Sequence, residues 1–136
     1  MLSKVEHVAL AVSDLEAAIK LYTEVWGLVL EHREVVEDQG VEEAMLSIGQ
    51  TYIQLLSPTS PQSTVARFIQ KRGEGLHHIA YEVGDIEVEL QKLKSNGVQL
   101  IDEAPRAGSR GTRVAFVHPA GNLGVLVELV QAKSIS

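Results

Sequence analysis

The chain has 136 residues, which is enough for one compact domain with a sizeable core. Its 45% hydrophobic and 22% charged residues exclude a disordered or low-complexity polypeptide. The absence of Cys excludes disulfides, thiolate metal sites and cysteine nucleophiles. A net charge of −6 argues against nucleic acid as a partner, and no apolar run is long enough for a membrane span. The N-terminus lacks the apolar core of a signal peptide, so we expect a cytoplasmic protein.

The most informative feature is an internal repeat. Residues 6–16 and residues 77–87 share the pattern x-His-(Val/Ile)-Ala-x-x-Val-x-Asp-(Leu/Ile)-Glu. Such a repeat indicates the architecture before any motif is considered. It predicts one domain over residues 1–136, with module one at about 1–60, a linking helix at about 63–72 and module two at about 76–131.

Hydrophobic periodicity predicts the same β-α-β-β-β order in both modules. In module one we expect a strand over 5–12, a helix over 14–26, and strands over about 28–36, 41–48 and 51–57. The linking helix begins at its N-cap, Ser63. In module two we expect a strand over 77–83, a helix over 85–96, and strands near 98–102, 112–118 and 124–131.

One such module cannot cover its own sheet. Two modules together predict an α+β fold in which eight mixed, mostly antiparallel strands form a curved sheet. The helices are expected on the convex face, and the other face is expected to line a cleft.

Strand alternation places two repeat-related histidines on that second face. In the first strand, His7 shares a face with Ala9 and Ala11, which leave space beside it, and His78 occupies the equivalent position with Ala80. A single His in a strand is more often a structural residue. Two equivalent ones on the same face favour a ligand role.

Gln54 and Glu128 are the single strongly polar residues of two otherwise apolar strands, at equivalent points of the modules. A carboxylate is costly to bury unless it is paired or binds a metal. With His7 and His78 they offer two imidazoles, an amide oxygen and a carboxylate. This mixed N/O set suits a divalent ion such as Co, Mn, Ni or Zn, and the sequence leaves the choice among them open.

The other histidines have weaker claims. His77 points to the opposite face and is expected to pack or hydrogen-bond there. His32 lies in a charged stretch and is expected to be solvated. His118 precedes Pro119, where a role in a turn is favoured.

These features resemble the vicinal oxygen chelate (glyoxalase/bleomycin resistance/dioxygenase) superfamily and, within it, the methylmalonyl-CoA epimerase family. The resemblance covers nearly the whole chain and rests on residues 6–9, 52–56, 75–80 and 105–129. It implies a metal-containing cleft with the ligands His7, Gln54, His78 and Glu128. It also implies epimerisation of (2R)/(2S)-methylmalonyl-CoA, by α-proton abstraction and reprotonation through a metal-stabilised enolate.

The resemblance further implies two catalytic bases, Glu128 and a residue of the strand over 41–48. Alternation places Glu43 on the face of Val41 and Met45, with Glu42 on the opposite, apolar face. A bulge would exchange the two, so Glu42 stays open as the second base.

The implied acyl-CoA substrate needs further contacts. Ser63 and Thr64 at a helix N-terminus are candidates for an anion, although capping is the simpler role for Ser63. The loop over 106–111 is flexible and basic, and its candidates are Arg106, Gly108 and Ser109. A plain surface turn explains this loop about as well. The superfamily also implies a homodimer, with no membrane partner.

Three other functions are compatible with the fold. A glyoxalase I-like lactoylglutathione lyase uses similar ligands but would lack the second base at Glu43. A ring-cleaving dioxygenase would bind iron without Gln54. A metal-free small-molecule binding module would need no ligand set at all.

Overall fold

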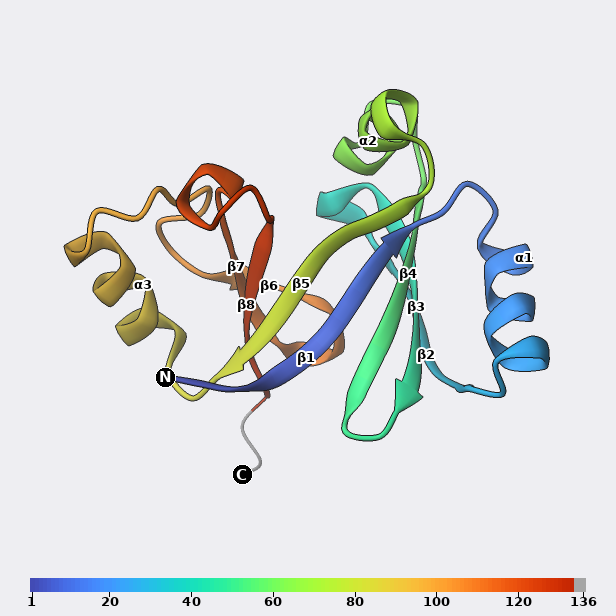
Figure 1. The fold of residues 1–136 in the computed structure, drawn as a ribbon, viewed down its shortest axis with the longest axis horizontal. Coiled ribbons are helices and arrows are strands. Elements are labelled where there is room, and N and C mark those ends of the chain that lie inside the picture. Colours follow the sequence, from blue (N-terminus) through green and yellow to red (C-terminus); the bar gives the residue numbers. More distant parts are fainter. Residues whose placement is uncertain (134–136) are drawn as a thin grey trace. The chain divides into compact units, whose positions relative to one another are not determined.

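The computed structural model describes residues 1–133, and its elements follow the predicted order (Figure 1). The first half contains β1 (Leu2–Ala11), α1 (Leu15–Lys20), β2 (Val29–Val36), β3 (Val41–Ile48) and β4 (Thr51–Pro58). The helix α2 (Thr64–Arg72) follows. The second half contains β5 (Gly75–Val83), α3 (Ile86–Ser95), β6 (Arg106–Ala107), β7 (Arg113–Val117) and β8 (Val127–Gln131).

The eight strands of the described chain form one sheet in the order β2-β3-β4-β1-β5-β8-β7-β6. β1 and β4 are parallel, as are β5 and β8, whereas β3 is antiparallel to both β2 and β4, and β7 to both β6 and β8. The predicted α+β fold with an eight-stranded mixed sheet is thereby confirmed. None of the helices in residues 1–133 has the length and apolar character needed to cross a membrane.

The prediction of a strand near 98–102 is wrong. Only Leu100 makes an isolated bridge there, to Val117, and the sixth strand is the short pair Arg106–Ala107. The amides of Ile101 and Asp102 both donate to the carbonyl of Phe116, so this segment does not follow a regular ladder. The apolar residues that suggested a strand instead pack against the core, where Val98 and Leu100 contact the α3 cluster.

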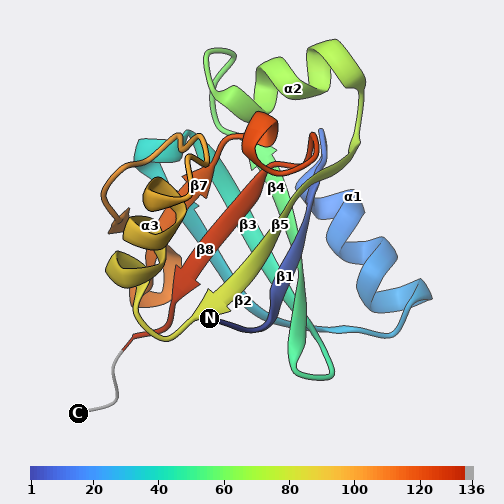
Figure 2. The same ribbon diagram turned by 60° about the vertical axis from the view of Figure 1, so that its left-hand side comes forward.

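Contacts divide the chain into two compact units, His7–His77 and Met1–Glu6 with the residues from His78 onward. In the His7–His77 unit, α1 lies along one face of the strands (Figure 2). Its buried Leu15 and Ile19 pack on Ala44, Leu46 and Leu55. The Asp14 side chain caps this helix by accepting a hydrogen bond from the Ala17 amide. The helix continues as one π-helical segment, Leu21–Val25, before Gly27.

α2 packs on the opposite face of the same strands. Its buried Val65 joins a cluster with Ala9, Ala11, Val41 and Leu56. Since these residues share the faces of His7, Glu43 and Gln54, α2 covers one end of the face that carries the polar candidates.

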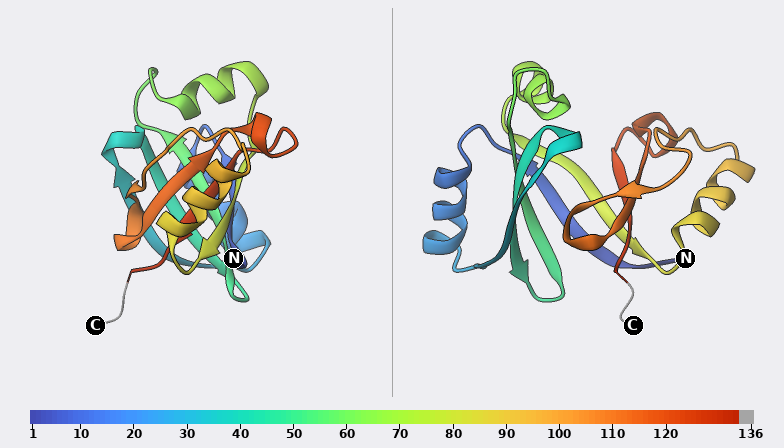
Figure 3. Two further views of the ribbon diagram at one scale, coloured as in Figure 1. Left: turned by 90° about the vertical axis from the view of Figure 1, so that its left-hand side faces the viewer. Right: turned by 180° about the vertical axis from the view of Figure 1, so that it is seen from behind.

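In the unit that contains His78, α3 lies beside β7 and β8 (Figure 3). Ile86 and Leu90 of α3 pack on one face of the strands, with a cluster of small and branched side chains, Ala115, Val117, Val127 and Leu129. The alternating residues of β8, Glu128 and Val130, therefore lie on the other face. The helix begins at its N-cap Asp85, which accepts from the amides of Glu87 and Val88.

Candidate metal-binding and catalytic site

Three candidates of the His7–His77 unit lie on one face of its strands. In the parallel β1–β4 pair, Ala9 is opposite Gln54, and His7 lies two residues earlier on the same face. In the β3–β4 pair, Glu43 is opposite Leu56, two residues from Gln54. His7, Glu43 and Gln54 are all buried. The register of three strands, together with the small Ala9, therefore gathers buried polar groups on the face predicted from alternation.

His78 and Glu128 are held together in the other unit. Ala80 is opposite Glu128 in the β5–β8 pair, and His78 Nε2 lies 3.2 Å from Glu128 Oε1. Phe116 is opposite Glu128 in the β7–β8 pair, and its ring meets the His78 imidazole edge-on with centroids 5.4 Å apart. Aromatic packing and a hydrogen bond thus orient the His78 ring.

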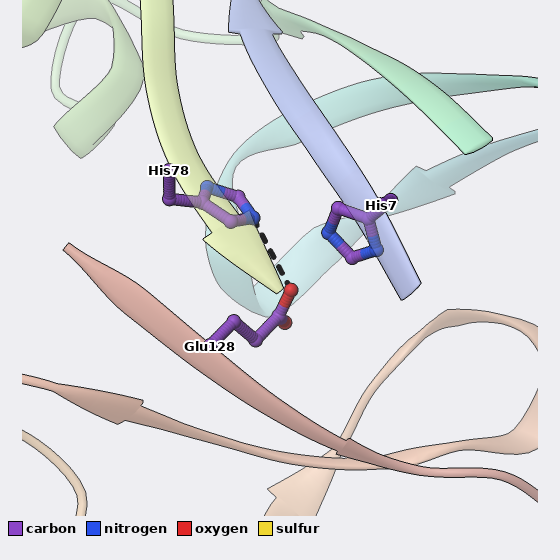
Figure 4. A group of neighbouring side chains, drawn as sticks. All are labelled: His7, His78 and Glu128. Carbon is purple, nitrogen blue, oxygen red and sulfur yellow. Dashed lines mark hydrogen bonds and ion pairs between the residues drawn. The ribbon is translucent and has the colours of Figure 1, made fainter. Parts of the chain in front are cut away.

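The donor atoms of His7, His78 and Glu128 all lie within 4.8 Å of one another, and Figure 4 shows the three side chains directed toward one another. All three are buried. The fourth predicted ligand, Gln54, has a buried Oε1 that finds no hydrogen-bond partner within residues 1–133. A buried amide oxygen without a partner is costly, and a cation is one partner that satisfies it. The donor set therefore fits a divalent ion.

The two adjacent glutamates of β3 differ in surroundings. Glu43 is only 2% exposed. Glu42 faces the other side, where it is half-buried and its Oε2 accepts from Arg33 Nε at 2.8 Å. Hydrogen bonds to Glu16 and Glu42 raise the pKa of Arg33. Glu43, and not Glu42, thus shares the face of His7 and Gln54.

The candidate residues at the start of α2 have structural roles. Ser63 is buried and its hydroxyl accepts from the Ala66 amide, which makes it the N-cap. It also packs closely on Gly40, where an added Cβ would come within 2.9 Å of the Ser63 Cβ. Thr64 is the first residue of the helix.

The predicted loop over 106–111 contains a short strand and a 3-10 turn. Arg106 is part of β6, on the same face as Phe116, and its guanidinium lies 5.6 Å from that ring centroid. Gly108 is required because a Cβ there would lie 2.6 Å from Thr112 Oγ1. Ser109 is buried, and its carbonyl accepts from both the hydroxyl and the amide of Thr112.

An ion pair missed by sequence reasoning anchors this loop. Arg110, at φ 58°, donates from both terminal nitrogens to the carboxylate of Glu6, at 3.0 and 3.1 Å. Glu6 directly precedes His7. The available signal was its place beside Val8 and Leu10 on one face of the strand, because a buried carboxylate requires a cation.

Of the three remaining histidines, two lie in the surroundings that were predicted for them and one does not. His77 packs edge-on against Phe68, and His118 Nδ1 accepts from the Ala120 amide in a turn, as predicted for both. His32 is not simply solvated, since it is half-buried and its Nε2 lies 2.7 Å from Glu34 Oε1.

Residues 6–116 match the glyoxalase/bleomycin resistance protein/dioxygenase superfamily. The chain belongs to this superfamily, and the predicted family is confirmed. The more specific likeness is to methylmalonyl-CoA epimerases. The ethylmalonyl-CoA/methylmalonyl-CoA epimerase of Cereibacter sphaeroides is 38% identical, over 96% of this chain and 99% of that protein.

Solved structures extend this likeness to the fold. A variant of Streptomyces coelicolor methylmalonyl-CoA epimerase, in complex with 2-nitronate-propionyl-CoA, is 38% identical with a TM-score of 0.96, covering 100% of this chain and 99% of that one. A methylmalonyl-CoA epimerase in complex with methylmalonyl-CoA and NH4+ is 39% identical, with the same TM-score and coverage.

Proposed function

We propose that the protein is a metal-dependent epimerase that interconverts (2R)- and (2S)-methylmalonyl-CoA. The observation that carries this is the buried donor set, His7, His78 and Glu128 with ligand atoms within 4.8 Å of one another, in a chain with full-length similarity to methylmalonyl-CoA epimerases. Epimerisation needs the proton at C2 to leave from one face and a proton to arrive on the other. That carbon is acidic because a thioester and a carboxylate flank it.

The metal would be held by His7, Gln54, His78 and Glu128. A divalent ion in such a mixed N/O site acts as a Lewis acid that stabilises negative charge developing on a substrate oxygen. The buried Gln54 Oε1 supports this assignment because it needs a partner that residues 1–133 do not provide. The donor set is compatible with Co, Mn, Ni or Zn.

Two carboxylates would move the proton. Glu43 takes the proton of C2 at one face, and Glu128 exchanges a proton at the other. General acid–base catalysis needs side chains that can take and return a proton at the reacting atom, and Glu43 and Glu128 are buried carboxyl groups of this kind. A buried Glu43 also keeps water away from the reacting carbon.

The substrate is an acyl-CoA. Arg106 supports recognition of the substrate carboxylate, because it is a cation on the face of Glu128 and its Nε makes a 3.6 Å ion pair with Asp102 but no hydrogen bond within residues 1–133. Gly108 and Ser109 would shape the adjoining loop, and Ser63 and Thr64 would place the α2 N-terminus toward an anionic part of the substrate. We propose that the active protein is a cytoplasmic homodimer.

A stereochemical assay tests the function. Enantiopure (2S)-methylmalonyl-CoA is incubated with metal-loaded protein, and the decay of its circular dichroism toward the equilibrium mixture is followed. The proposal predicts decay that EDTA stops. A stable signal, together with turnover of the hemithioacetal of methylglyoxal and glutathione, would favour a lactoylglutathione lyase instead.

A further inference from the structure

Two side chains of β2 lie on the same face of the sheet as Glu43. In the β2–β3 ladder Glu34 is directly opposite Glu43, and His32 is directly opposite Met45. Opposite residues of an antiparallel pair share a face, with Cβ atoms about 4.5–5.5 Å apart. His32, Glu34 and Glu43 therefore lie on one face of the strands, with the two glutamates as direct cross-strand neighbours.

A β-bulge places the pair there. The register shifts between Leu30 and His32, so that Glu31 is the extra residue of β2. In a strand without this bulge, regular alternation from the Leu30–Leu46 pair would bring His32 opposite Ala44, on the face that α1 covers. Bulges occur frequently beside active sites, where they redirect side chains.

Glu43 lies in the interior, whereas His32 and Glu34 both reach solvent. Glu43 is 2% exposed, whereas the side chains of His32 and Glu34 are 34% and 37% exposed. His32 Nε2 and Glu34 Oε1 are 2.7 Å apart, a separation typical of a strong charge-assisted hydrogen bond. His is also the side chain whose ordinary pKa allows proton exchange with water near neutral pH.

A base as buried as Glu43 needs such a route. After it removes the C2 proton, Glu43 is a neutral carboxylic acid and must lose that proton before it can act as a base again. Its 2% exposure leaves little direct contact with water.

We propose that Glu34 and His32 form a proton relay between Glu43 and solvent, an inference that rests on the proposed role of Glu43 as a base. The Glu43 carboxyl passes its proton to the Glu34 carboxylate. Glu34 passes a proton to His32 Nε2, and the resulting imidazolium releases one to water or buffer. All three groups then return to their starting protonation states with one proton delivered to solvent, and Glu128 takes one proton from solvent to replace the one it gave to C2, so that the cycle is proton-neutral.

Buffer rescue tests the relay. Glu34→Gln and His32→Gln remove the proton carriers but keep hydrogen-bonding groups, and Glu42→Gln is the matched control on the opposite face of β3. The rate of methylmalonyl-CoA epimerisation is measured at constant pH and ionic strength with increasing imidazole. We expect kcat of both relay variants to fall at least about tenfold at low buffer, with KM unchanged, and to recover with imidazole. Wild type and Glu42→Gln should not respond to imidazole.

The outcomes separate the relay from the proposed function. If wild type epimerises and the relay variants keep full kcat at low buffer, the relay is wrong. It is also wrong if they lose activity without rescue or through a raised KM, since that indicates a structural role. Thermal unfolding of each variant identifies loss of fold, and the half-exposed His32 is the milder change. If wild type itself does not epimerise, the proposed function fails and the relay fails with it.

Discussion

Replacing Arg110 with Met should destabilise the protein strongly, although the residue lies in a surface loop. Its guanidinium makes two hydrogen bonds to Glu6, and the Glu6 side chain is only 6% exposed. The variant keeps the volume and the left-handed backbone of this position but leaves the Glu6 carboxylate without its cation. Water cannot replace the cation easily because the carboxylate is buried.

The expected loss follows from this burial. Removing one partner of a buried ion pair typically costs about 3–5 kcal/mol. Arg110 itself is 22% exposed, which places the expected value near the lower end, at about 3 kcal/mol. For a chain of this length that corresponds to a fall in Tm of roughly 10 °C.

Urea unfolding at pH 7 measures the change, and a double-mutant cycle assigns it. The Glu6→Gln/Arg110→Met variant should recover at least about half of the loss, because it no longer buries a charge. A loss below about 1 kcal/mol for Arg110→Met would refute the reasoning, since surface ion pairs give values of that size. Strict additivity in the cycle would refute it as well.

Four further changes have defined outcomes. Glu43→Gln should lower kcat about 10²–10⁴-fold with an unchanged Tm, and a smaller effect would remove Glu43 as a base. His78→Ala should weaken divalent metal binding in calorimetry, and unchanged affinity would exclude it as a ligand. Ser63→Ala should cost about 1 kcal/mol in urea unfolding through loss of the α2 cap, and a neutral result would contradict the cap. Gly108→Ala should cost about 1–3 kcal/mol by the same measurement, because the added Cβ would overlap Thr112, and unchanged stability would show that the loop yields.

Much of this architecture was predictable because it depends on local periodicity. The repeat around His7 and His78 indicated the element order, and alternation alone placed both histidines, Gln54 and Glu128 on faces that the structure shows to be buried. Alternation also placed Glu43, and not Glu42, on the face of Val41 and Met45, since β3 has no bulge at that point.

Other features depend on tertiary contacts that no local pattern encodes. The segment 98–102 has strand-like apolar residues, but it follows a turn at Gly97 and packs as an irregular segment. The bulge at Glu31 reverses the faces of His32 and Glu34, which strict alternation cannot anticipate. The Glu6–Arg110 pair joins residues that are far apart in sequence.

The most direct test of the central claim is proton NMR of (2S)-methylmalonyl-CoA in D₂O with metal-loaded protein, beside the Glu43→Ala variant and an EDTA-treated sample. A metal-assisted epimerase with Glu43 as a base should incorporate deuterium at C2 while stereochemical purity is lost. Both should stop with EDTA and be severely slowed in the variant. Absence of exchange in protein that demonstrably binds the metal would contradict the assignment.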